Sequence, residues 1–373
     1  MRVGFDVSAL HRPHSRGLER VVRCLVEALE RRGGLEVVRL APEDGADLRR
    51  WRQRDLPRRA AAEGLAGVHS FTSAFPLRGP GHRVQTVHEL PWRHGVRENA
   101  DARHYAWAAL GPLRAARVVC PSEHVAADLA RGPLVPRKKI RVVRWGVEPR
   151  FAPEPPPMVI DESALTRYRL GEEPFVLAPG AVRPKKDLAA LLYGMAERKR
   201  RGAEPLRVLV TGGDTQQLRE DLGLASKLGL ARWIAMLDEV AEQDLPSLYR
   251  LARAVPALSR SEGFGLTVLE AMACGTPVLV PRAGAQAEVA GEAGIVVDPR
   301  SPASVADGLE RALSARAELR RAGVERARGS SSWLWRRTPP IACASGAPAT
   351  STRGALTRAR ARAPRRARPR RPT

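Results

Sequence analysis

Short apolar runs alternate with longer helix-like stretches along this chain, and this alternation constrains the fold more than any other feature. In the first half the expected strands are Arg2–Val7, Gly67–Phe71, Arg83–His88, Arg117–Pro121 and Ile140–Arg144. In the second half they are Pro174–Ala178, Leu206–Val210, Trp233–Leu237, Ala254–Leu258, Pro277–Val280 and Ile295–Val297. Helical patterns are expected at about 17–31, 99–115, 123–131, from Asp187, and at 215–229, 241–252, 266–273 and 302–314. The order predicts α/β domains built on parallel sheets that helices cover on both faces.

A proline-rich segment, Arg150–Pro157, separates the two halves. A chain of 373 residues suits two domains better than one core. The predicted division is one parallel-sheet domain over 1–150, a linker over 151–173, a second domain over 174–328, and an irregular tail over 329–373. Two such domains would enclose a cleft at the carboxyl ends of their strands, where ligands of α/β proteins bind.

The net charge of +23 is concentrated in the tail. Residues 329–373 contribute +11 without one acidic residue, and the remainder of the chain contributes +12. The tail shows neither helical nor strand periodicity, so we expect disorder from about 338 onward. A basic nucleic-acid-binding arm and a reading-frame change in a GC-rich gene are the two alternatives. Because this argument rests on the tail alone, a nucleic-acid partner is not expected for the folded part.

Two further features bear on location and redox state. The chain has no apolar run of about 18 residues and no apolar stretch at its start, so a cytoplasmic protein is expected. Its cysteines, Cys24, Cys120, Cys274 and Cys343, lie far apart and are expected to be free thiols. The basic stretch Arg49–Arg54, with Arg58 and Arg59, suits either an anionic membrane surface or a solvated face.

The most informative segment runs from Ser261 to Glu270 and reads Ser-Glu-Gly-Phe-Gly-Leu-Thr-Val-Leu-Glu. It follows an expected strand and opens an expected helix, whose first N–H groups suit phosphate or sugar hydroxyls. Glu262 in the loop and Glu270 in the helix are positioned to accept hydrogen bonds from different hydroxyls of one ligand. The residues expected to bring backbone to that ligand are Gly263, Phe264, Gly265, Leu266 and Thr267.

This segment, followed by Ala-Met-Ala-Cys-Gly-Thr-Pro-Val, resembles the signature of glycosyltransferase family 4. The resemblance extends over roughly residues 1–325. It implies the GT-B fold, two Rossmann-like domains facing a central cleft, and transfer with retention. The first domain would serve the acceptor and the second would bind a nucleotide sugar. No metal and no other cofactor is implied.

A second motif, Pro179 to Leu188, is similar to the family's Gly-x-x-x-Pro-Arg-Lys-Asn-Leu phosphate loop. Lys186 takes the position of the family's lysine, and Lys185 stands where arginine is frequent. Lysine at 185 keeps the positive charge but lacks the planar guanidinium that can donate two parallel hydrogen bonds. The resemblance implies that both lysines neutralise charge on the leaving diphosphate. A solvated lysine pair is the alternative.

In the first half, Val87-His88-Glu89-Leu90 resembles the family's Val-His-Asp-Leu, with one extra methylene at Glu89. The implied role of His88 is contact with the transferred sugar near the acceptor; a lone histidine after a strand is otherwise more often structural. Gly17 begins a helix where the family has Gly-Ile-Gly-Arg-Tyr, and its amide is implied to contact donor phosphate or acceptor. Glu19 replaces the second glycine of that motif.

The implied activity is transfer of a hexose, mannose or glucose being favoured, from a nucleoside-diphosphate sugar to a hydroxyl acceptor. The acceptor would be a sugar or a lipid-linked group, in synthesis of cell-surface polysaccharide, lipopolysaccharide or glycolipid. Within the resemblance, His88, Lys186 and Glu262 are the implied catalytic residues. The alternative is a catalytically impaired GT-B protein that binds nucleotide sugar, because Glu19, Glu89, Ala287 and the C-terminal segment depart from the family pattern.

Overall fold

The computed structural model describes residues 1–11, 16–72, 75–96, 109–131, 135–156, 161–171, 173–238 and 240–330. These residues belong to one compact unit. Most of the helix expected at 99–115 lies outside the described residues, as do Cys343 and the tail from 331 onward.

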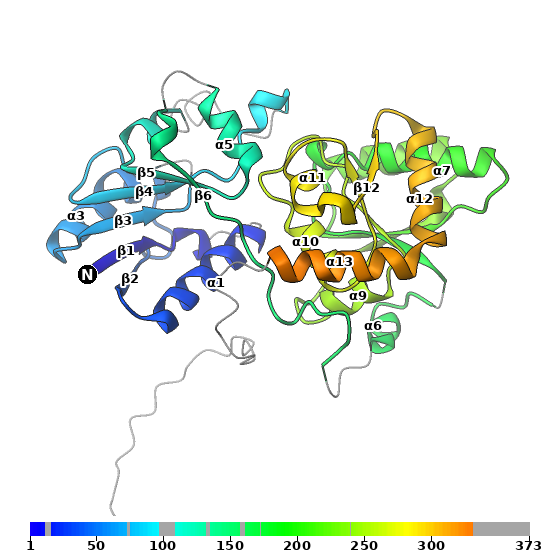
Figure 1. Ribbon diagram of the computed structural model, residues 1–373, viewed down its shortest axis with the longest axis horizontal. Helices are drawn as coiled ribbons and strands as arrows, with labels where there is room; N and C mark the ends of the chain where they lie inside the picture. Colours follow the sequence, from blue (N-terminus) through cyan, green and yellow to red (C-terminus); the bar gives the residue numbers. More distant parts are fainter. Residues whose placement is uncertain are drawn as a thin grey trace, which may run out of the picture. The chain divides into compact units, whose positions relative to one another are not determined.

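The first half is one six-stranded parallel sheet in the order β2-β1-β3-β4-β5-β6. Its strands are β1 (Arg2–Asp6), β2 (Glu36–Leu40), β3 (Gly67–Ser70), β4 (His82–Thr86), β5 (Arg117–Cys120) and β6 (Ile140–Val142). Its principal helices are α1 (Arg16–Arg32), α2 (Leu48–Arg50), α3 (Leu56–Ala62) and α5 (Glu123–Ala130). Figure 1 shows α1 and α5 on opposite sides of this sheet, and their apolar side chains accordingly belong to separate core clusters.

The second half has two three-stranded parallel sheets, β9-β8-β7 and β10-β11-β12, joined by a bridge between Val176 and Ala254. The strands are β7 (Phe175–Ala178), β8 (Arg207–Thr211), β9 (Ile234–Leu237), β10 (Val255–Pro256), β11 (Val278–Pro281) and β12 (Ile295–Val297). The helices are α6 (Glu162–Arg167), α7 (Leu188–Arg200), α8 (Gln216–Lys227), α9 (Leu245–Leu251), α10 (Leu266–Ala273), α11 (Ala285–Ala290), α12 (Pro302–Ser314) and α13 (Arg316–Ser330). Strand order reverses between β7 and β10, which is where ligands bind in open α/β sheets.

Most predicted strands and helices are confirmed, with ends shifted by a few residues, and α10 has the predicted bounds. Six strands and α-helices were not predicted: β2, α2, α3, α6, α11 and α13. The apolar signal of β2 is weak because it is an edge strand with only Leu40 fully buried. The charge-rich α13 packs against α10 and extends into the segment that was expected to be irregular.

Buried cysteines match the expectation for three of the four thiols. Cys24, Cys120 and Cys274 are free and buried. Burial raises the pKa of the Cys120 and Cys274 thiols to about 12, so both stay protonated and unreactive at neutral pH.

No helix in the described ranges is long and apolar enough to cross a bilayer.

The basic stretch 49–54 is not entirely a surface feature, which corrects the interpretation of it as an exposed face. Trp51 and Arg52 are buried. The Trp51 indole donates to the Asp6 carboxylate at 3.1 Å, and the Arg52 guanidinium donates to the Ser8 hydroxyl at 3.1 Å. Arg49, Arg50, Arg54, Arg58 and Arg59 remain exposed. The buried pair anchors the η2 turn (Trp51–Asp55) beneath the end of β1.

The Arg52→Ala variant is expected to lose about 3 kcal/mol of unfolding free energy, because it leaves the buried Asp6 carboxylate with one cation fewer. The matched change Arg54→Ala, at an exposed position of the same turn, is expected to stay within about 0.5 kcal/mol of wild type. Urea unfolding of both variants measures this difference. Equal stability of the two variants would contradict the buried placement of Arg52.

Candidate functional site

The site is built on loops that follow β7 and β10, the two strands at which the order reverses. Gly265 has φ +101° and precedes α10, a conformation that a residue with a side chain rarely adopts. It turns the chain so that α10 begins beside the loop after β7. A pocket with about 500 Å³ of empty space lies there. Its polar and glycine lining includes Gly180, Lys186, Ser259, Thr267 and Gln286.

Lys186 lines this pocket, and Glu262 contacts Lys186. The Lys186 ammonium lies 2.8 Å from Glu262 Oε1, and the Ser259 hydroxyl donates to the same oxygen at 3.2 Å. Burial alone would raise the pKa of the Glu262 carboxyl, but Lys186 and Lys185 outweigh it and lower that pKa to about 2. Glu262 is therefore ionised at neutral pH and presents fixed negative charge beside the pocket.

Lys185 points elsewhere. Its side chain is buried, and its ammonium donates to both oxygens of Glu89 at 2.7 and 2.8 Å. Glu262 lies 3.9 Å away on its other side. Lysine at 185 and glutamate at 89, two of the substitutions that distinguish this chain from the family pattern, thus form one ion pair. Because Glu89 follows β4, this pair connects the loop after β7 to the first sheet.

The loop from Gly263 to Gly265, here called the glycine loop, contacts the first half of the chain directly. A Cβ on Gly263 would overlap the backbone carbonyl of His88, so only glycine allows this approach. The Ser122 hydroxyl donates to the Gly263 carbonyl at 2.7 Å. Phe264 is buried and packs on Trp145, whose ring in turn lies 5.2 Å from the His88 ring. The loop therefore brings His88 and Gly263 together.

His88 is held as a neutral donor. Its Nε2 lies 2.6 Å from the Phe71 carbonyl, which accepts the Nε2 proton. Desolvation by burial lowers the pKa of the His88 imidazole to about 4, although the Phe71 carbonyl opposes this shift. Nδ1 is buried and has no hydrogen-bond partner among the described residues, and His88 does not line the pocket at the strand reversal.

Acidification is expected to destabilise the protein through His88. The unfolded chain takes up a proton at about pH 6.5, whereas the folded protein resists protonation until about pH 4, so stability is lost as the pH falls through that window. Between pH 7 and pH 5 the wild type should lose about 2 kcal/mol more than His88→Gln, which cannot titrate there. Urea melts at both pH values measure the difference. Parallel losses in the two proteins would show that His88 is not held neutral.

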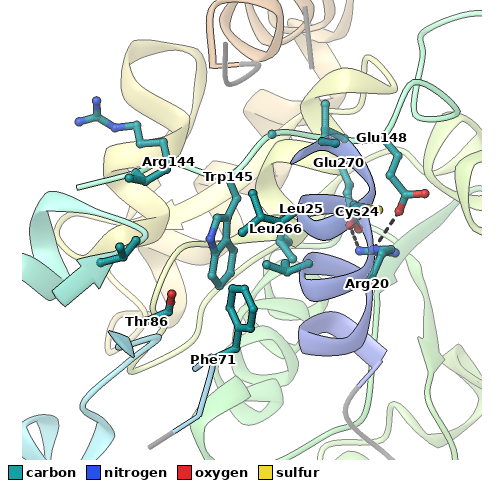
Figure 2. Close-up of a pocket in the computed structure, with 16 residues that line it drawn as sticks. Arg20, Cys24, Leu25, Phe71, Thr86, Arg144, Trp145, Glu148, Leu266 and Glu270 are labelled. Atoms are coloured by element: carbon teal, nitrogen blue, oxygen red, sulfur yellow. Dashed lines mark hydrogen bonds and ion pairs between the residues drawn. The ribbon is translucent and has the colours of Figure 1, made fainter. Parts of the chain in front are cut away.

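A second pocket, with about 690 Å³ of empty space, lies beside α1, α10 and the segment after β6 (Figure 2). Glu270 is buried at its edge. Figure 2 shows the Arg20 guanidinium between the carboxylates of Glu270 and Glu148. The Tyr249 hydroxyl donates to the other Glu270 oxygen at 2.9 Å. Desolvation raises the pKa of the Glu270 carboxyl despite the neighbouring Arg20.

Of the remaining predicted residues, Leu266 and Thr267 line a pocket, whereas Gly263, Phe264 and Gly265 line neither of the two. Leu266 lines the larger pocket with Glu270, and Thr267 lines the smaller one with Lys186. Gly17 lies exposed in the first turn of α1 and lines neither of these two pockets.

Side chains that were given no role in the sequence analysis also contribute to the two pockets. They are Arg20, Glu148, Trp145, Tyr249, Ser259 and Gln286. Arg20 stands in the segment at Gly17 that was compared with the family's Gly-Ile-Gly-Arg-Tyr, so its place in that motif was the available signal.

The comparisons with known proteins agree with this geometry. Residues 166–330 match the family model described as glycosyl transferases group 1. They form a glycosyl transferases group 1 domain. This domain contains Lys186, Glu262 and the glycine loop, together with both strands at which the sheet order reverses.

Similar sequences carry related names. The chain is 35% identical over 194 residues to D-inositol 3-phosphate glycosyltransferase of Rhodococcus opacus, an overlap of 47% of this chain and 44% of the relative. It is 34% identical over 254 residues to the protein of that name from Salinispora arenicola, covering 64% and 56%. O-antigen chain mannosyltransferase B of Escherichia coli is 36% identical over 138 residues, covering 36% and 35%. The chain thus spans about half the length of the curated relatives it matches, or less.

Solved structures extend the likeness to both halves. Sucrose-phosphate synthase from Thermosynechococcus elongatus superposes with a TM-score of 0.71 at 20% identity, covering 89% of this chain and 95% of that one. Anabaena Alr3699/HepE, solved in complex with UDP and glucose, superposes with a TM-score of 0.66 at 17% identity, covering 89% and 95%. The protein with the group 1 domain therefore has the GT-B fold, as the sequence predicted.

Proposed function

We propose that this protein is a retaining glycosyltransferase that moves a hexose, with mannose or glucose favoured, from a nucleoside-diphosphate sugar to a hydroxyl acceptor. The observation that carries the proposal is the meeting of Lys186, Glu262 and the start of α10 around the pocket at the strand reversal. A cation and free helix N–H groups suit a diphosphate, and an ionised carboxylate suits sugar hydroxyls. The names of the matching relatives, and the UDP bound by the Anabaena protein, support the same reading.

In the proposed reaction the bond between the anomeric carbon and the diphosphate oxygen breaks through an oxocarbenium-like state. The acceptor oxygen forms the new bond on the same face, and its proton passes to the departing diphosphate. Lys186 and the amides near Gly265–Thr267 stabilise that leaving group, while Lys185, which is bound to Glu89, adds only a more distant charge. Glu262 binds the donor sugar and Glu270 the ribose. We propose no metal for this step.

Bound donor would have to displace two contacts. Lys186 must exchange Glu262 for a phosphate oxygen, and Glu270 must exchange Arg20 or the Tyr249 hydroxyl for ribose. Each exchange replaces one charge-assisted hydrogen bond by another, so the net cost is small compared with that of leaving a buried charge unpaired. His88 Nδ1, which is buried and has no partner among the described residues, is the proposed acceptor for a hydroxyl of the transferred sugar once the surrounding loops open to it.

For the acceptor we propose a sugar or lipid-linked hydroxyl in polysaccharide, lipopolysaccharide or glycolipid synthesis, at the cytoplasmic face of a membrane. The exposed arginines that remain in the 49–59 stretch give the first half a basic surface for anionic lipid headgroups.

A second candidate function is nucleotide-sugar binding without transfer. It is favoured by the engagement of Glu270 with Arg20 and Tyr249, and of Lys185 with Glu89, since these contacts occupy two charges that the reaction would use.

A thermal-shift screen over nucleoside diphosphates and nucleotide sugars tests the proposal first. We expect one nucleotide series to raise the melting temperature, and the best donor then to release nucleoside diphosphate when acceptor sugars are added. A thermal shift without turnover, even with lipid-linked acceptors, would favour the binding protein. Absence of any shift and of any turnover would refute both.

A further inference from the structure

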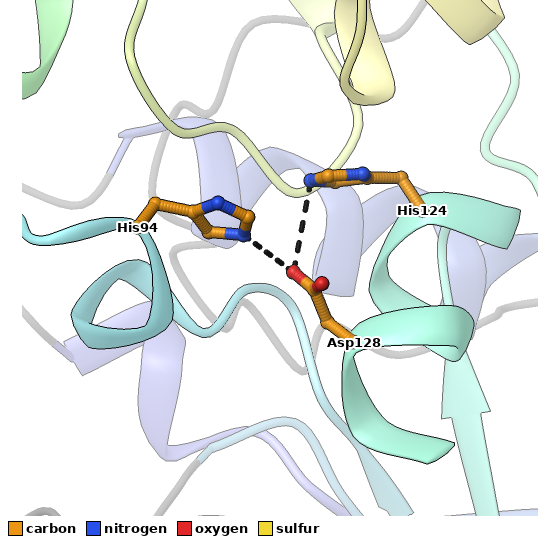
Figure 3. A group of neighbouring side chains, drawn as sticks. All are labelled: His94, His124 and Asp128. Atoms are coloured by element: carbon orange, nitrogen blue, oxygen red, sulfur yellow. Dashed lines mark hydrogen bonds and ion pairs between the residues drawn. The ribbon is translucent and has the colours of Figure 1, made fainter. Parts of the chain in front are cut away.

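Three side chains with metal-binding atoms converge in the first half of the chain, apart from both pockets. His94 ends the η3 turn (Pro91–His94), and His124 and Asp128 lie one turn apart on α5. Residues at this spacing share one helix face. In Figure 3 the two imidazole rings and the carboxylate point toward one another. None of the three lines either pocket described above.

The distances are close to those of a coordination shell. Asp128 Oδ2 lies 2.5 Å from His94 Nε2 and 3.7 Å from His124 Nε2, and the three candidate ligand atoms lie within 4.8 Å of one another. A tetrahedral ion with bonds of about 2.0–2.1 Å holds its ligand atoms about 3.3 Å apart. Side-chain movements of about 1 Å or less would therefore convert the present arrangement into three bonds to one ion.

A hydrogen bond between His94 and Asp128 explains only part of this arrangement. Both histidines direct the same ring nitrogen, Nε2, at the same carboxylate oxygen, and the distance of His124 is too long for a hydrogen bond. The carboxylate itself is buried, while both imidazoles are partly accessible. A buried carboxylate with two accessible imidazoles leaves an approach open to a small cation.

The neighbouring charges position Asp128 without closing this approach. Arg131 donates to Oδ1 at 3.0 Å, which leaves Oδ2 directed at the histidines. Arg93 donates to the Asp128 backbone carbonyl, and Glu288 accepts from the His124 backbone N–H at 3.1 Å. Fixing the second carboxylate oxygen by a hydrogen bond is what outer partners of metal ligands do.

We propose that His94, His124 and Asp128 form a binding site for a first-row divalent metal ion, with Zn²⁺ as the expected occupant. Two imidazoles and one carboxylate favour zinc-like ions over Mg²⁺ or Ca²⁺, which prefer oxygen ligands. Water would complete the tetrahedron. The ion ties the turn that follows the His88 loop to α5, so its role is to stabilise the first half, and the site does not depend on the proposed transfer reaction.

Isothermal titration calorimetry of the full chain, freed of any histidine tag, with ZnCl₂ at pH 7.5 tests the site. We expect one ion per chain for the wild type. His94→Ala and His124→Ala should each weaken binding at least about tenfold, since the loss of an outer partner alone has that effect. The double variant should not bind. His82→Ala removes an exposed histidine outside the cluster and should bind as wild type does.

Two further measurements separate a specific site from loose binding. Zn²⁺ should raise the melting temperature of wild type and His82→Ala, and leave the double variant unchanged. Titration with MgCl₂ under the same conditions should show no binding at this site, because Mg²⁺ prefers oxygen ligands. Circular dichroism without metal checks that the variants fold. Wild-type stoichiometry and affinity in the double variant, or no binding by the wild type, would overturn the proposal.

Discussion

The Lys186→Ala variant is expected to lose at least about 100-fold in kcat/KM for sugar transfer, while the fold stays intact. The ammonium lies beside the pocket at the strand reversal and is the cation placed to meet a leaving diphosphate. Its removal also leaves the ionised Glu262 carboxylate with weaker compensation. Lys185, at 3.9 Å, is already bound to Glu89 and cannot fully replace it.

Steady-state kinetics with the donor found by thermal shift would measure this loss. Lys227→Ala is the matched control, because Lys227 is exposed at the end of α8 and belongs to neither pocket. A Lys186→Ala enzyme with wild-type kcat/KM would show that the loop after β7 does not serve the leaving group. Loss of donor binding without loss of kcat at saturation would restrict Lys186 to ground-state binding.

The Gly263→Ala variant is expected to lose about 100-fold in transfer for a steric reason. Its new methyl group would overlap the His88 carbonyl, and a backbone atom cannot rotate away as a side chain can. The glycine loop must therefore shift, and this changes the position of Glu262 relative to the His88 imidazole. Overpacking of this kind also costs about 1–3 kcal/mol of stability.

Gly223→Ala is the control for this change, since Gly223 lies in α8 with open space around the position of a Cβ. It should leave activity unchanged and favour the helix slightly. If Gly263→Ala keeps wild-type activity, the close approach of the glycine loop to the first sheet does not exist in the working enzyme.

The sequence was most informative where local pattern and chemistry coincide. The helix α10 has its predicted bounds because Gly265 precedes its first turn and Gly275 follows its C-cap residue. Glu262 and Lys186 were predicted to serve one ligand, and they do lie in contact. Edge strand β2 and the charged helix α13 were not predicted, because packing on other elements stabilises them and their own sequences show no clear apolar pattern.

Partners of the buried charges could not be predicted from the sequence. Nothing local to Lys185 indicates that it binds Glu89, a residue 96 positions away. Arg20 and Glu270 are 250 positions apart, and their contact depends on how α1 and α10 approach each other. Arg52 shows the same limit, because its neighbours in the sequence are exposed arginines while its own side chain is buried.

The Ser122 hydroxyl makes two hydrogen bonds at once, one within α5 and one to the glycine loop. Its oxygen accepts from the Val125 N–H and so caps α5, while its proton is donated to the Gly263 carbonyl. If the glycine loop withdraws to release product, the proton can turn to water while the cap persists. Breaking the bond to Gly263 would then cost about 1 kcal/mol and leave the first turn of α5 capped.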